Sequence, residues 1–260
     1  MITAVKGFTT LGKCIGIKRG RKDFAVIHSD RPCTTVAVYT RNKVQGAPLA
    51  VNRRHLRNNT ARVIVINSGI ANVATGKRGL EDALTVCRLA AEEFGVKESD
   101  VLVASTGVIG KRLPMKLIEK GIRGSKNQLS RRGKAAEAIM TTDTVKKETS
   151  VKAGFMIGAI AKGSGMIHPN MATMLAFIVT NADLKASDLK TCLKKAVDES
   201  FNMVSVDMDT STSDMAVLMS NRTVKADKEK FQKKLSAVCT TLARKIAADG
   251  EGATKLIEAG

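Results

Sequence analysis

The sequence of 260 residues predicts an α/β sandwich. Short β-branched segments bounded by polar or glycine residues recur along the chain, and such segments are typical of strands. Longer segments repeat apolar residues at helical spacing, which is typical of helices with one buried face. The two kinds of segment do not alternate strictly. We therefore expect helices packed against sheets rather than a doubly wound nucleotide-binding sheet.

Six segments are expected to be strands because they are short, rich in β-branched residues and flanked by turn-forming residues. Hydrophobic residues make up 43% of the chain, which is enough to form a sizeable core that buries these six strands. The segments are residues 24–28, 34–40, 61–67, 101–105, 173–180 and 215–220.

Three amphipathic helices are expected in addition to these strands. Gly95 ends the first, because a glycine without a Cβ atom suits the left-handed turn that follows a helix. Ser187 with Asp188 opens the second, and Asp227 precedes the third, since short polar side chains cap helix N-termini. Their apolar stripes are expected to form core faces and to carry no chemistry. The stripes lie within residues 80–94, 189–197 and 231–246.

The formal net charge of +19 raises the question of nucleic-acid binding. Nucleic-acid-binding proteins usually cluster their positive charge and interleave aromatic residues that stack on bases. This chain has 7 Phe, 1 Tyr and no Trp, and its longest basic groupings, residues 18–22 and 131–134, are short and far apart. We interpret the charge as a solvated surface that attracts anionic substrates, and we expect no nucleic-acid partner. A basic RNA-binding protein without catalysis is the alternative, and its affinity would fall steeply with added salt.

Cysteine and histidine give no indication of a metal site. The five cysteines are scattered without a Cys-x-x-Cys pair, which is typical of reduced core thiols in a cytosolic protein. His28, His55 and His168 lie too far apart in the sequence to indicate metal ligands, so we expect neither a metal nor another cofactor. The N-terminus lacks a secretory signal, and no apolar stretch approaches a membrane span of about 18 residues. The chain is therefore expected to be soluble and cytoplasmic, without a membrane partner.

A candidate nucleophile lies where a glycine-rich loop runs through one proline into an apolar, β-branched segment. This junction, within residues 162–180, places Thr173 at the mouth of a strand. A hydroxyl fixed at a strand end beside backbone N–H donors suits nucleophilic catalysis. The simpler interpretation is that Thr173 is only a β-forming residue that begins the strand.

Several familiar motifs fail on inspection. The segment from Gly158 to Gly165 lacks the lysine and hydroxyl residue that a phosphate-binding loop needs after its second glycine. No Gly-x-Ser-x-Gly elbow is present, and the few histidines offer no Ser-His-Asp arrangement. A threonine nucleophile then needs another base. N-terminal nucleophile enzymes use their own α-amine, with an unperturbed pKa of about 7.7–8.0, and here it would exist only if the Ala172-Thr173 bond were cut.

Motifs spread over nearly all 260 residues point to one known family. Together they resemble the ornithine acetyltransferase family, also called the bifunctional glutamate N-acetyltransferase family of arginine biosynthesis. Besides residues 162–180, the motifs are Lys6-Gly7-Phe8, Asn67-Ser68-Gly69 with Ala71-Asn72, Ala104-Ser105-Thr106-Gly107-Val108-Ile109-Gly110, Met140-Thr141-Thr142-Asp143-Thr144, Ser200-Phe201-Asn202 through Asp209-Thr210-Ser211-Thr212, and Asp249-Gly250-Glu251-Gly252-Ala253-Thr254-Lys255.

The resemblance implies a self-cleaving enzyme of the N-terminal threonine nucleophile type. Cleavage between Ala172 and Thr173 would leave an α-chain of residues 1–172 and a β-chain of residues 173–260, expected to associate as a heterotetramer or larger assembly. The implied reaction moves an acetyl group from N-acetylornithine to glutamate by a ping-pong mechanism with an acetyl-threonine intermediate. Two alternatives stay open: additional use of acetyl-CoA as a donor substrate, and an amidase or aminopeptidase that uses the same threonine.

The resemblance also assigns roles to individual residues. Without it, an ordinary turn at a strand end would explain residues 106–107, and a surface loop would explain Glu251. A lysine suits a substrate carboxylate, a glutamate suits an amino group, and a threonine suits either. The implied assignments are Thr173 as nucleophile, Thr106 and Gly107 as the oxyanion hole, and Thr144, Lys162, Thr173 and Glu251 as substrate-binding residues.

Some positions depart from the family pattern. Val73-Ala74-Thr75-Gly76 stands where the family commonly has Ala-Cys-Thr-Gly, and Val145-Lys146 stands where Phe-Pro is usual. The segment between Thr144 and Lys162 is also shorter than is typical. Family members continue well beyond the Asp-Gly-Glu-Gly motif, so we expect a truncated second domain and weak or absent acetyl transfer from these 260 residues alone.

Overall fold

The computed structural model describes residues 1–168 and 174–259, and within them the strands form one mixed sheet. The strands are β1 (Phe8–Lys13), β2 (Phe24–Tyr39), β3 (Thr60–Ile70), β4 (Val101–Val108), β5 (Lys147–Lys152), β6 (Met156–Lys162), β7 (Leu175–Asp183) and β8 (Met215–Lys225). Their order across the sheet is β4-β3-β2-β8-β7-β6-β5, and β1 pairs with β2 outside this path. Most neighbours are antiparallel, but β3 runs parallel to β4, and β7 runs parallel to β8.

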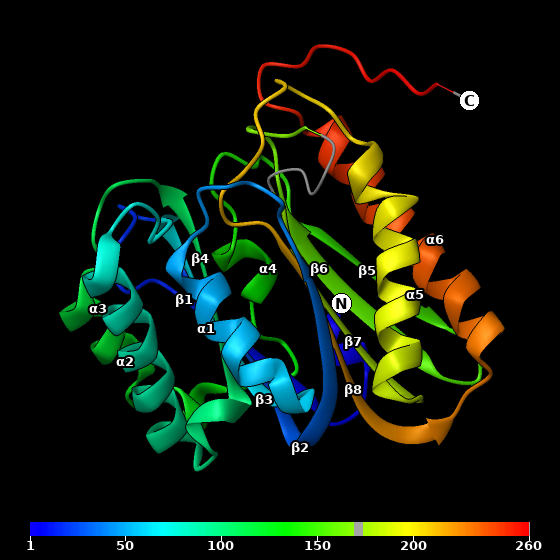
Figure 1. Ribbon diagram of the computed structural model, residues 1–260, viewed down its shortest axis with the longest axis horizontal. Helices are drawn as coiled ribbons and strands as arrows, with labels where there is room; N and C mark the ends of the chain where they lie inside the picture. Colours follow the sequence, from blue (N-terminus) through cyan, green and yellow to red (C-terminus); the bar gives the residue numbers. More distant parts are fainter. Residues whose placement is uncertain (169–173, 260) are drawn as a thin grey trace.

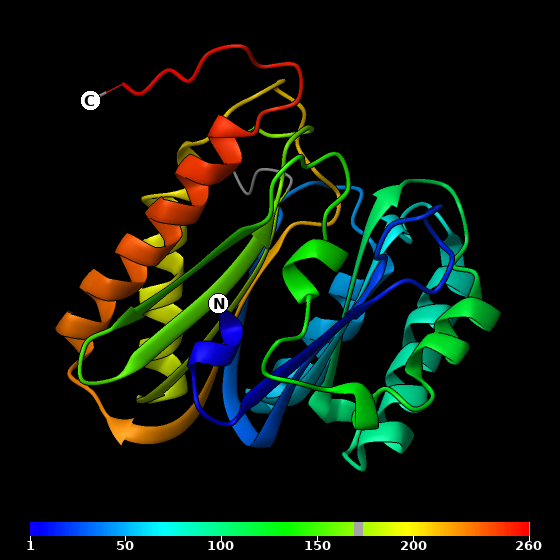
Figure 2. The same ribbon diagram turned by 180° about the vertical axis from the view of Figure 1, so that it is seen from behind.

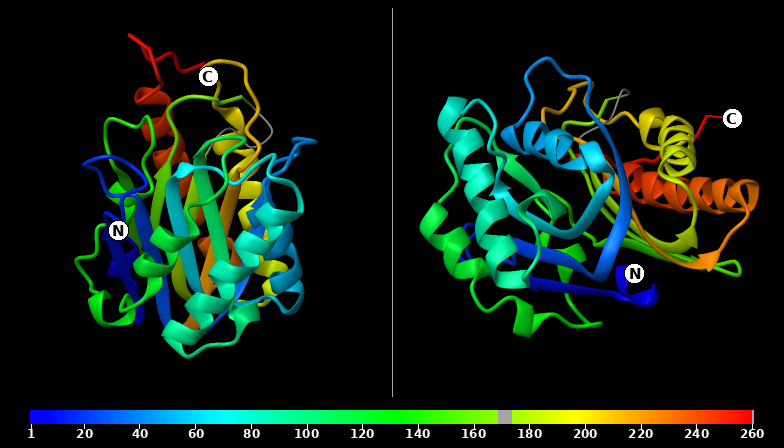
Figure 3. Two further views of the ribbon diagram at one scale, coloured as in Figure 1. Left: turned by 90° about the vertical axis from the view of Figure 1, so that its left-hand side faces the viewer. Right: turned by 60° about the horizontal axis from the view of Figure 1, so that its bottom comes forward.

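The larger helices pack in two separate groups on this sheet. Figure 1 shows α2 and α3 on one side of the molecule and α5 and α6 on the other, with the sheet between them, and Figure 3 shows the same separation from two further directions. The helices are α1 (Ala47–His55), α2 (Gly76–Phe94), α3 (Met115–Ile122), α4 (Ala135–Ala138), α5 (Ala186–Asp198) and α6 (Lys228–Ala248).

The ends of these helices test the expected capping residues. Gly95 follows α2 with a left-handed φ of 66°, as expected. The Asp227 side chain caps α6 by accepting a hydrogen bond from the Lys230 amide at 2.8 Å. The expected cap of α5 was wrong, because its N-cap position is Lys185 and makes no side-chain cap. Ser187 lies inside the first turn of that helix.

One long strand joins the two halves of the sheet. The first half of β2 pairs with β1 and β3, and its second half pairs with β8. The sequence predicted two strands here, residues 24–28 and 34–40. The structure joins them through a register shift between His28 and Cys33, because the polar residues between them form a bulge that leaves the strand intact. The view from behind in Figure 2 shows β1 lying along this strand near the N-terminus.

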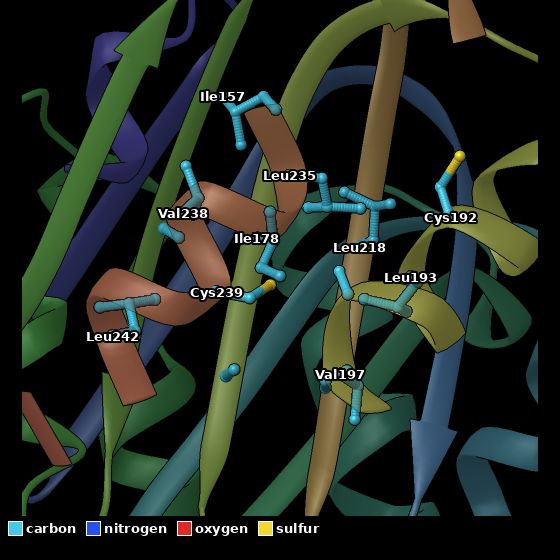
Figure 4. Close-up of a cluster of buried hydrophobic side chains, with 14 of the residues drawn as sticks. Ile157, Ile178, Cys192, Leu193, Val197, Leu218, Leu235, Val238, Cys239 and Leu242 are labelled. Atoms are coloured by element: carbon cyan, nitrogen blue, oxygen red, sulfur yellow. The ribbon is translucent and has the colours of Figure 1, made fainter. Parts of the chain in front are cut away.

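Three hydrophobic clusters establish the layers. The first fills the space between α5 and α6 and the outer face of β5 to β8, as Figure 4 shows for residues such as Ile178, Leu218 and Leu235. The second gathers residues from both halves of the sheet, including Ile64 and Phe177. The third lies under α2 and α3. Alternate residues of β7, such as Phe177 and Ile178, enter different clusters, so both faces of the sheet are buried. This confirms the predicted α/β sandwich.

The described residues also test the expectations about cysteines and membrane spans. Four of the five cysteines are buried free thiols, as expected, but Cys14 is exposed. Across residues 1–168 and 174–259, no helix has the length and apolar character that a membrane crossing requires.

Candidate active site

A cavity of about 530 Å³ opens where several strand ends meet. Its walls come from the ends of β3, β4 and β6, from the segment before β8, and from the loop after α6. The sheet therefore brings together residues that are far apart in the sequence. Four residues that the family resemblance marked line this cavity, namely Thr106, Gly107, Lys162 and Glu251. A concave site with a few convergent polar groups is the usual setting for substrate binding.

Close packing of β3 against β4 explains the glycines at this edge. Gly69 and Gly107 are paired in register and both have positive φ angles, 112° and 129°. A Cβ atom on Gly107 would lie 2.3 Å from the backbone carbon of Gly69, so a larger residue there would push the strands apart. This approach turns the end of β4 toward the cavity, where Gly107 and the buried Thr106 contribute to its lining.

Lys162 connects β6 to this edge from inside the protein. Its side chain is buried, and its Nζ donates a hydrogen bond to the Thr106 Oγ1 at 3.3 Å. Because the lysine occupies the hydroxyl oxygen as a donor, the hydroxyl hydrogen remains available for another acceptor, and the positive charge makes it a stronger donor. Burial lowers the pKa of Lys162, whereas nearby Asp143 opposes this change. The pair can stabilise negative charge that develops in the cavity.

Ala172 and Thr173, the expected cleavage site and nucleophile, lie outside the described residues. Met174 is the first described residue after them, and its amide donates to Asp214 Oδ1 at 2.9 Å. The Asp214 side chain is buried, and among the described residues its Oδ2 has no hydrogen-bond partner. Burial raises the pKa of Asp214 well above its usual range, although the Ser211 hydroxyl and the Met174 amide oppose the rise.

The structure does not bring Thr144 to the cavity. Its amide donates to Asp249 Oδ2 at 3.0 Å, and its hydroxyl donates to Asp249 Oδ1. Thr141 and Thr142, two and three residues earlier, line the cavity instead. Thr144 therefore does not line the cavity, because the chain turns at Asp143 and directs the following residue toward the end of α6, and its expected role in substrate binding stays a prediction.

Glu251 reaches the cavity from the loop after α6. Its amide donates to the Ser164 carbonyl at 3.0 Å, and the Ser164 hydroxyl donates to the Asp249 carbonyl at 2.7 Å. A Cβ atom on Gly165 would lie 2.2 Å from Glu251 Oε2, so glycine at this position leaves space for the carboxylate. The loop after β6 and the loop after α6 are thus joined directly beside the cavity.

Sequence reasoning missed several residues at this site. Lys18 belongs to a basic grouping that was interpreted as solvated surface, yet it lines the cavity and its Nζ donates to the Met140 carbonyl at 2.6 Å. Burial, followed by the charge of Arg21, lowers the pKa of Lys18 to about 8. Asp207 holds the loop after β6 by accepting hydrogen bonds from the amides of residues 166 and 167. The hydroxyl- and carboxylate-rich run of residues 209–214, which begins two residues later, is the signal in the sequence that points to this region.

Comparison with known proteins identifies relatives over almost the whole chain. The sequence profile of the ArgJ family matches residues 9–260. The arginine biosynthesis bifunctional protein ArgJ 2 of Clostridium acetobutylicum is 46% identical over 258 residues, which cover 98% of this chain and 66% of that protein. The chain thus spans about two thirds of the length of the curated relatives it matches.

Solved structures agree with the fold. The ornithine acetyltransferase of Mycobacterium tuberculosis, solved in complex with ornithine, is 32% identical with a TM-score of 0.62 and covers 65% of this chain and 94% of its own. The L-aminopeptidase D-Ala-esterase/amidase of Ochrobactrum anthropi, described as a variant of the Ntn hydrolase fold, is 13% identical with a TM-score of 0.56 and covers 96% and 86%. The second likeness concerns the fold alone. From the profile match and the 46% identity, the chain belongs to the ArgJ family.

Proposed function

We propose that this protein transfers an acetyl group from N-acetylornithine to glutamate through an acetyl-Thr173 intermediate, within arginine biosynthesis. The observation that carries the proposal is the single cavity that joins Thr106, Gly107, Lys162 and Glu251. These groups supply what acyl transfer requires besides a nucleophile: donors for an oxyanion, a cation for a carboxylate and an anion for an amine.

The nucleophile would arise by cleavage of the chain. The Thr173 hydroxyl attacks the Ala172 carbonyl carbon, the carbon–nitrogen bond breaks, and the acyl chain moves from nitrogen to oxygen. Water then hydrolyses the ester, which releases a carboxylate at Ala172 and a free α-amine at Thr173. Because that amine is the base of the later steps, an uncut chain would lack acetyl-transfer activity.

The comparisons support this cleavage. The region matched to the Mycobacterium tuberculosis structure is 65% of this chain but 94% of the solved chain, so the solved chain is shorter than this one. The curated relatives are longer than this chain, since nearly all of it covers only 66% of the Clostridium protein. A relative that is divided into separate polypeptides is expected to give this pattern. Such pieces would stay associated, and we propose a heterotetramer or larger assembly in the cytoplasm.

Acetyl transfer would follow in two balanced half-reactions. The Thr173 amine accepts the hydroxyl proton while Oγ attacks the acetyl carbonyl carbon, and the oxyanion accepts hydrogen bonds from Thr106 and the Gly107 backbone. Collapse of the intermediate breaks the bond to the substrate nitrogen, which takes the proton and leaves as ornithine. The amine of glutamate then attacks the acetyl-threonine ester and regenerates the hydroxyl. The proposed steps use no cofactor, and additional use of acetyl-CoA as a donor stays an alternative.

Substrate recognition would use the two charged residues of the cavity. Lys162 attracts the α-carboxylate of the amino acid, and Glu251 attracts its amino group. Both residues line the same cavity, and the loop that follows Lys162 contacts the Glu251 loop through Ser164. The site therefore favours a zwitterionic amino-acid substrate over a neutral one.

Incubation of the purified protein with N-acetylornithine, with and without glutamate, tests the proposal. Ornithine release that depends on glutamate, together with N-acetylglutamate formation, is expected of the acetyltransferase. Ornithine release to water without glutamate would favour the amidase alternative. On a denaturing gel the active protein should give pieces of residues 1–172 and 173–260, whereas Thr173→Ala should remain whole. An active protein that stays uncut would refute the mechanism.

A further inference from the structure

The proposed substrate residues Lys162 and Glu251 are held by a buried ring of ionic and hydrogen-bonded contacts. Lys147, at the start of β5, has a fully buried side chain, and its Nζ donates to Asp143 Oδ1 at 2.7 Å and to Asp249 Oδ2 at 2.6 Å. It is therefore a bridge between two carboxylates that lie 106 positions apart in numbering, on either side of the cavity loops.

Asp143, through its carboxylate, and Asp249, through its backbone carbonyl, both hold the loop after β6. Asp143 Oδ1 accepts a hydrogen bond from the Gly163 amide at 2.7 Å, directly after Lys162. The carbonyl of Asp249 accepts the Ser164 hydroxyl at 2.7 Å. The path from Lys147 through Asp143, residues 163–164 and Asp249 returns to Lys147, so the contacts close a ring.

The charged site residues lie close to two members of this ring, Gly163 and Asp249, and their positions depend on it. Lys162 precedes the first amide of the ring, and Glu251 lies two residues beyond Asp249, with its amide bound to the Ser164 carbonyl at 3.0 Å. A change in the distance between Asp143 and Asp249 would be passed to both residues. Neither Asp143 nor Lys147 lines the cavity itself, so an effect of either on substrate must act through these neighbours.

The charges of the ring favour its closed form. Burial alone would raise the pKa of Asp143, but Lys162, Lys147 and the Gly163 amide together hold that pKa below its usual value. Hydrogen bonds from Lys147 and Thr144 likewise hold the pKa of Asp249 below its usual value against burial. Both carboxylates are therefore ionised at neutral pH. Two buried carboxylates would repel each other without the ammonium group between them.

We propose that Lys147 is a positioning residue that fixes the spacing between Lys162 and Glu251, and that this spacing selects the length of the amino-acid substrate. The inference rests on the proposed function, since it assigns carboxylate and amine binding to those two residues. A fixed distance between the Lys162 ammonium and the Glu251 carboxylate discriminates between diamino acids that differ by one methylene group. A flexible pair would adjust to either length and would not discriminate.

Binding of L-ornithine, L-lysine and L-2,4-diaminobutyrate by isothermal titration tests the selection. The wild-type protein should prefer ornithine by about tenfold or more, the order that one methylene group can provide. Lys147→Met and Asp249→Asn should bring the three affinities within about threefold of one another, because the spacing is no longer fixed. Lys146→Met is the matched control: its exposed side chain pairs with Glu148 at 3.1 Å and lies outside the ring, and the variant should keep the preference.

Amide hydrogen exchange measured by NMR provides a readout that does not depend on substrate. The amides of Gly163 and Glu251 should exchange faster together in Lys147→Met and Asp249→Asn, and should be unchanged in Lys146→Met. Asp249→Asn retains an acceptor for Thr144 and so remains informative where Lys147→Met does not fold.

The outcomes separate the positioning role from a structural role. A uniform fall in affinity for all three ligands, with an unchanged ratio, would overturn the proposal and leave Lys147 as a stabilising residue only. Loss of exchange protection with retained selectivity would overturn it as well. If the wild-type protein binds none of the three ligands, the proposed substrate class is wrong and the selection falls with it, while faster exchange would still establish the ring as structural.

Discussion

Replacement of Asn52 by leucine should destabilise the protein, because this side chain takes the place of a neighbouring strand. β4 is the last strand of the sheet path, so one of its edges has no strand partner there. Asn52 on α1 is fully buried, donates to the Val103 carbonyl at 2.8 Å and accepts from the Val103 amide at 2.9 Å. His55, one turn further along α1, contacts the Val101 carbonyl at 2.8 Å.

The expected magnitude follows from these contacts. Asn52→Leu leaves the amide and the carbonyl of Val103 buried without partners, at a cost of about 1–3 kcal/mol for each group. The apolar side chain recovers part of this, about 1.5–3 kcal/mol for a fully buried leucine. We expect a net loss of about 1–3 kcal/mol in the free energy of unfolding.

Urea denaturation followed by circular dichroism measures this loss. All samples should have one protein concentration, because a cleaved chain unfolds with dissociation of its pieces. Arg54→Leu, at an exposed position of the same helix, is the matched control and should change stability by less than about 0.5 kcal/mol. If Asn52→Leu is as stable as this control, the asparagine is not satisfying the edge of β4 and the reasoning is wrong.

Three further predictions concern the site. Thr106→Ala should slow the proposed acetyl transfer by about a hundredfold to a thousandfold with the fold intact, since it removes the proposed oxyanion donor; wild-type turnover would show that the oxyanion hole lies elsewhere. The raised pKa of Asp214 means that its contribution to stability is present below pH of about 3.8 and is lost as pH rises through the folded pKa. Asp214→Asn should therefore show a flatter dependence of the urea midpoint on pH between about 4 and 8. An unchanged slope would contradict a raised pKa of Asp214 in the folded protein. Because the pKa of Lys18 is about 8, about half of its amine is neutral at that pH. Limited treatment with acetic anhydride should therefore acetylate Lys18 before the exposed lysines. Mass spectrometry of the peptides measures the order of modification.

Strong local patterns made the helices α2, α5 and α6 and the central strands predictable from the sequence, whereas α1, α3 and α4 were not expected. The stripe of α6 and its capping Asp227 specify a helix without any knowledge of the neighbours. The strands β3, β4 and β8 were also expected, because each contains a short apolar segment bounded by polar or glycine residues, and in the structure these segments are buried on both faces.

Other elements depend on contacts that a linear sequence does not reveal. β5 carries Lys147, Glu148 and Lys152 and pairs with β6 alone, so its composition resembles a surface segment more than a strand. The segment from Gly158 to Gly165 was compared only with a phosphate-binding loop, and no strand was expected there, yet Gly158 lies within β6, where a Cβ atom would lie 2.4 Å from the Met1 carbonyl oxygen. Pairing, not propensity, makes these two segments strands.

The candidate site was predicted only in part for the same reason. Thr106, Gly107, Lys162 and Glu251 line one cavity, whereas Thr144 lies outside it and binds Asp249. The position of a polar residue in a motif fixes its neighbourhood to within a few residues. The direction of its side chain is decided by a turn, here at Asp143, and that turn depends on Lys147 from the next strand.

The order of the strands has a consequence for the two products of a cut after residue 172. β7 and β8 would belong to the later product, but β8 is hydrogen-bonded to β2 and β7 to β6, and both of these partners would belong to the earlier product. The later product is thus interleaved between two parts of the earlier one. Removal of β7 and β8 would split the earlier product into two incomplete sheets with bare edges. The products would therefore have to fold as a single precursor before they are separated, and mixing them after independent synthesis should not reconstitute the sheet.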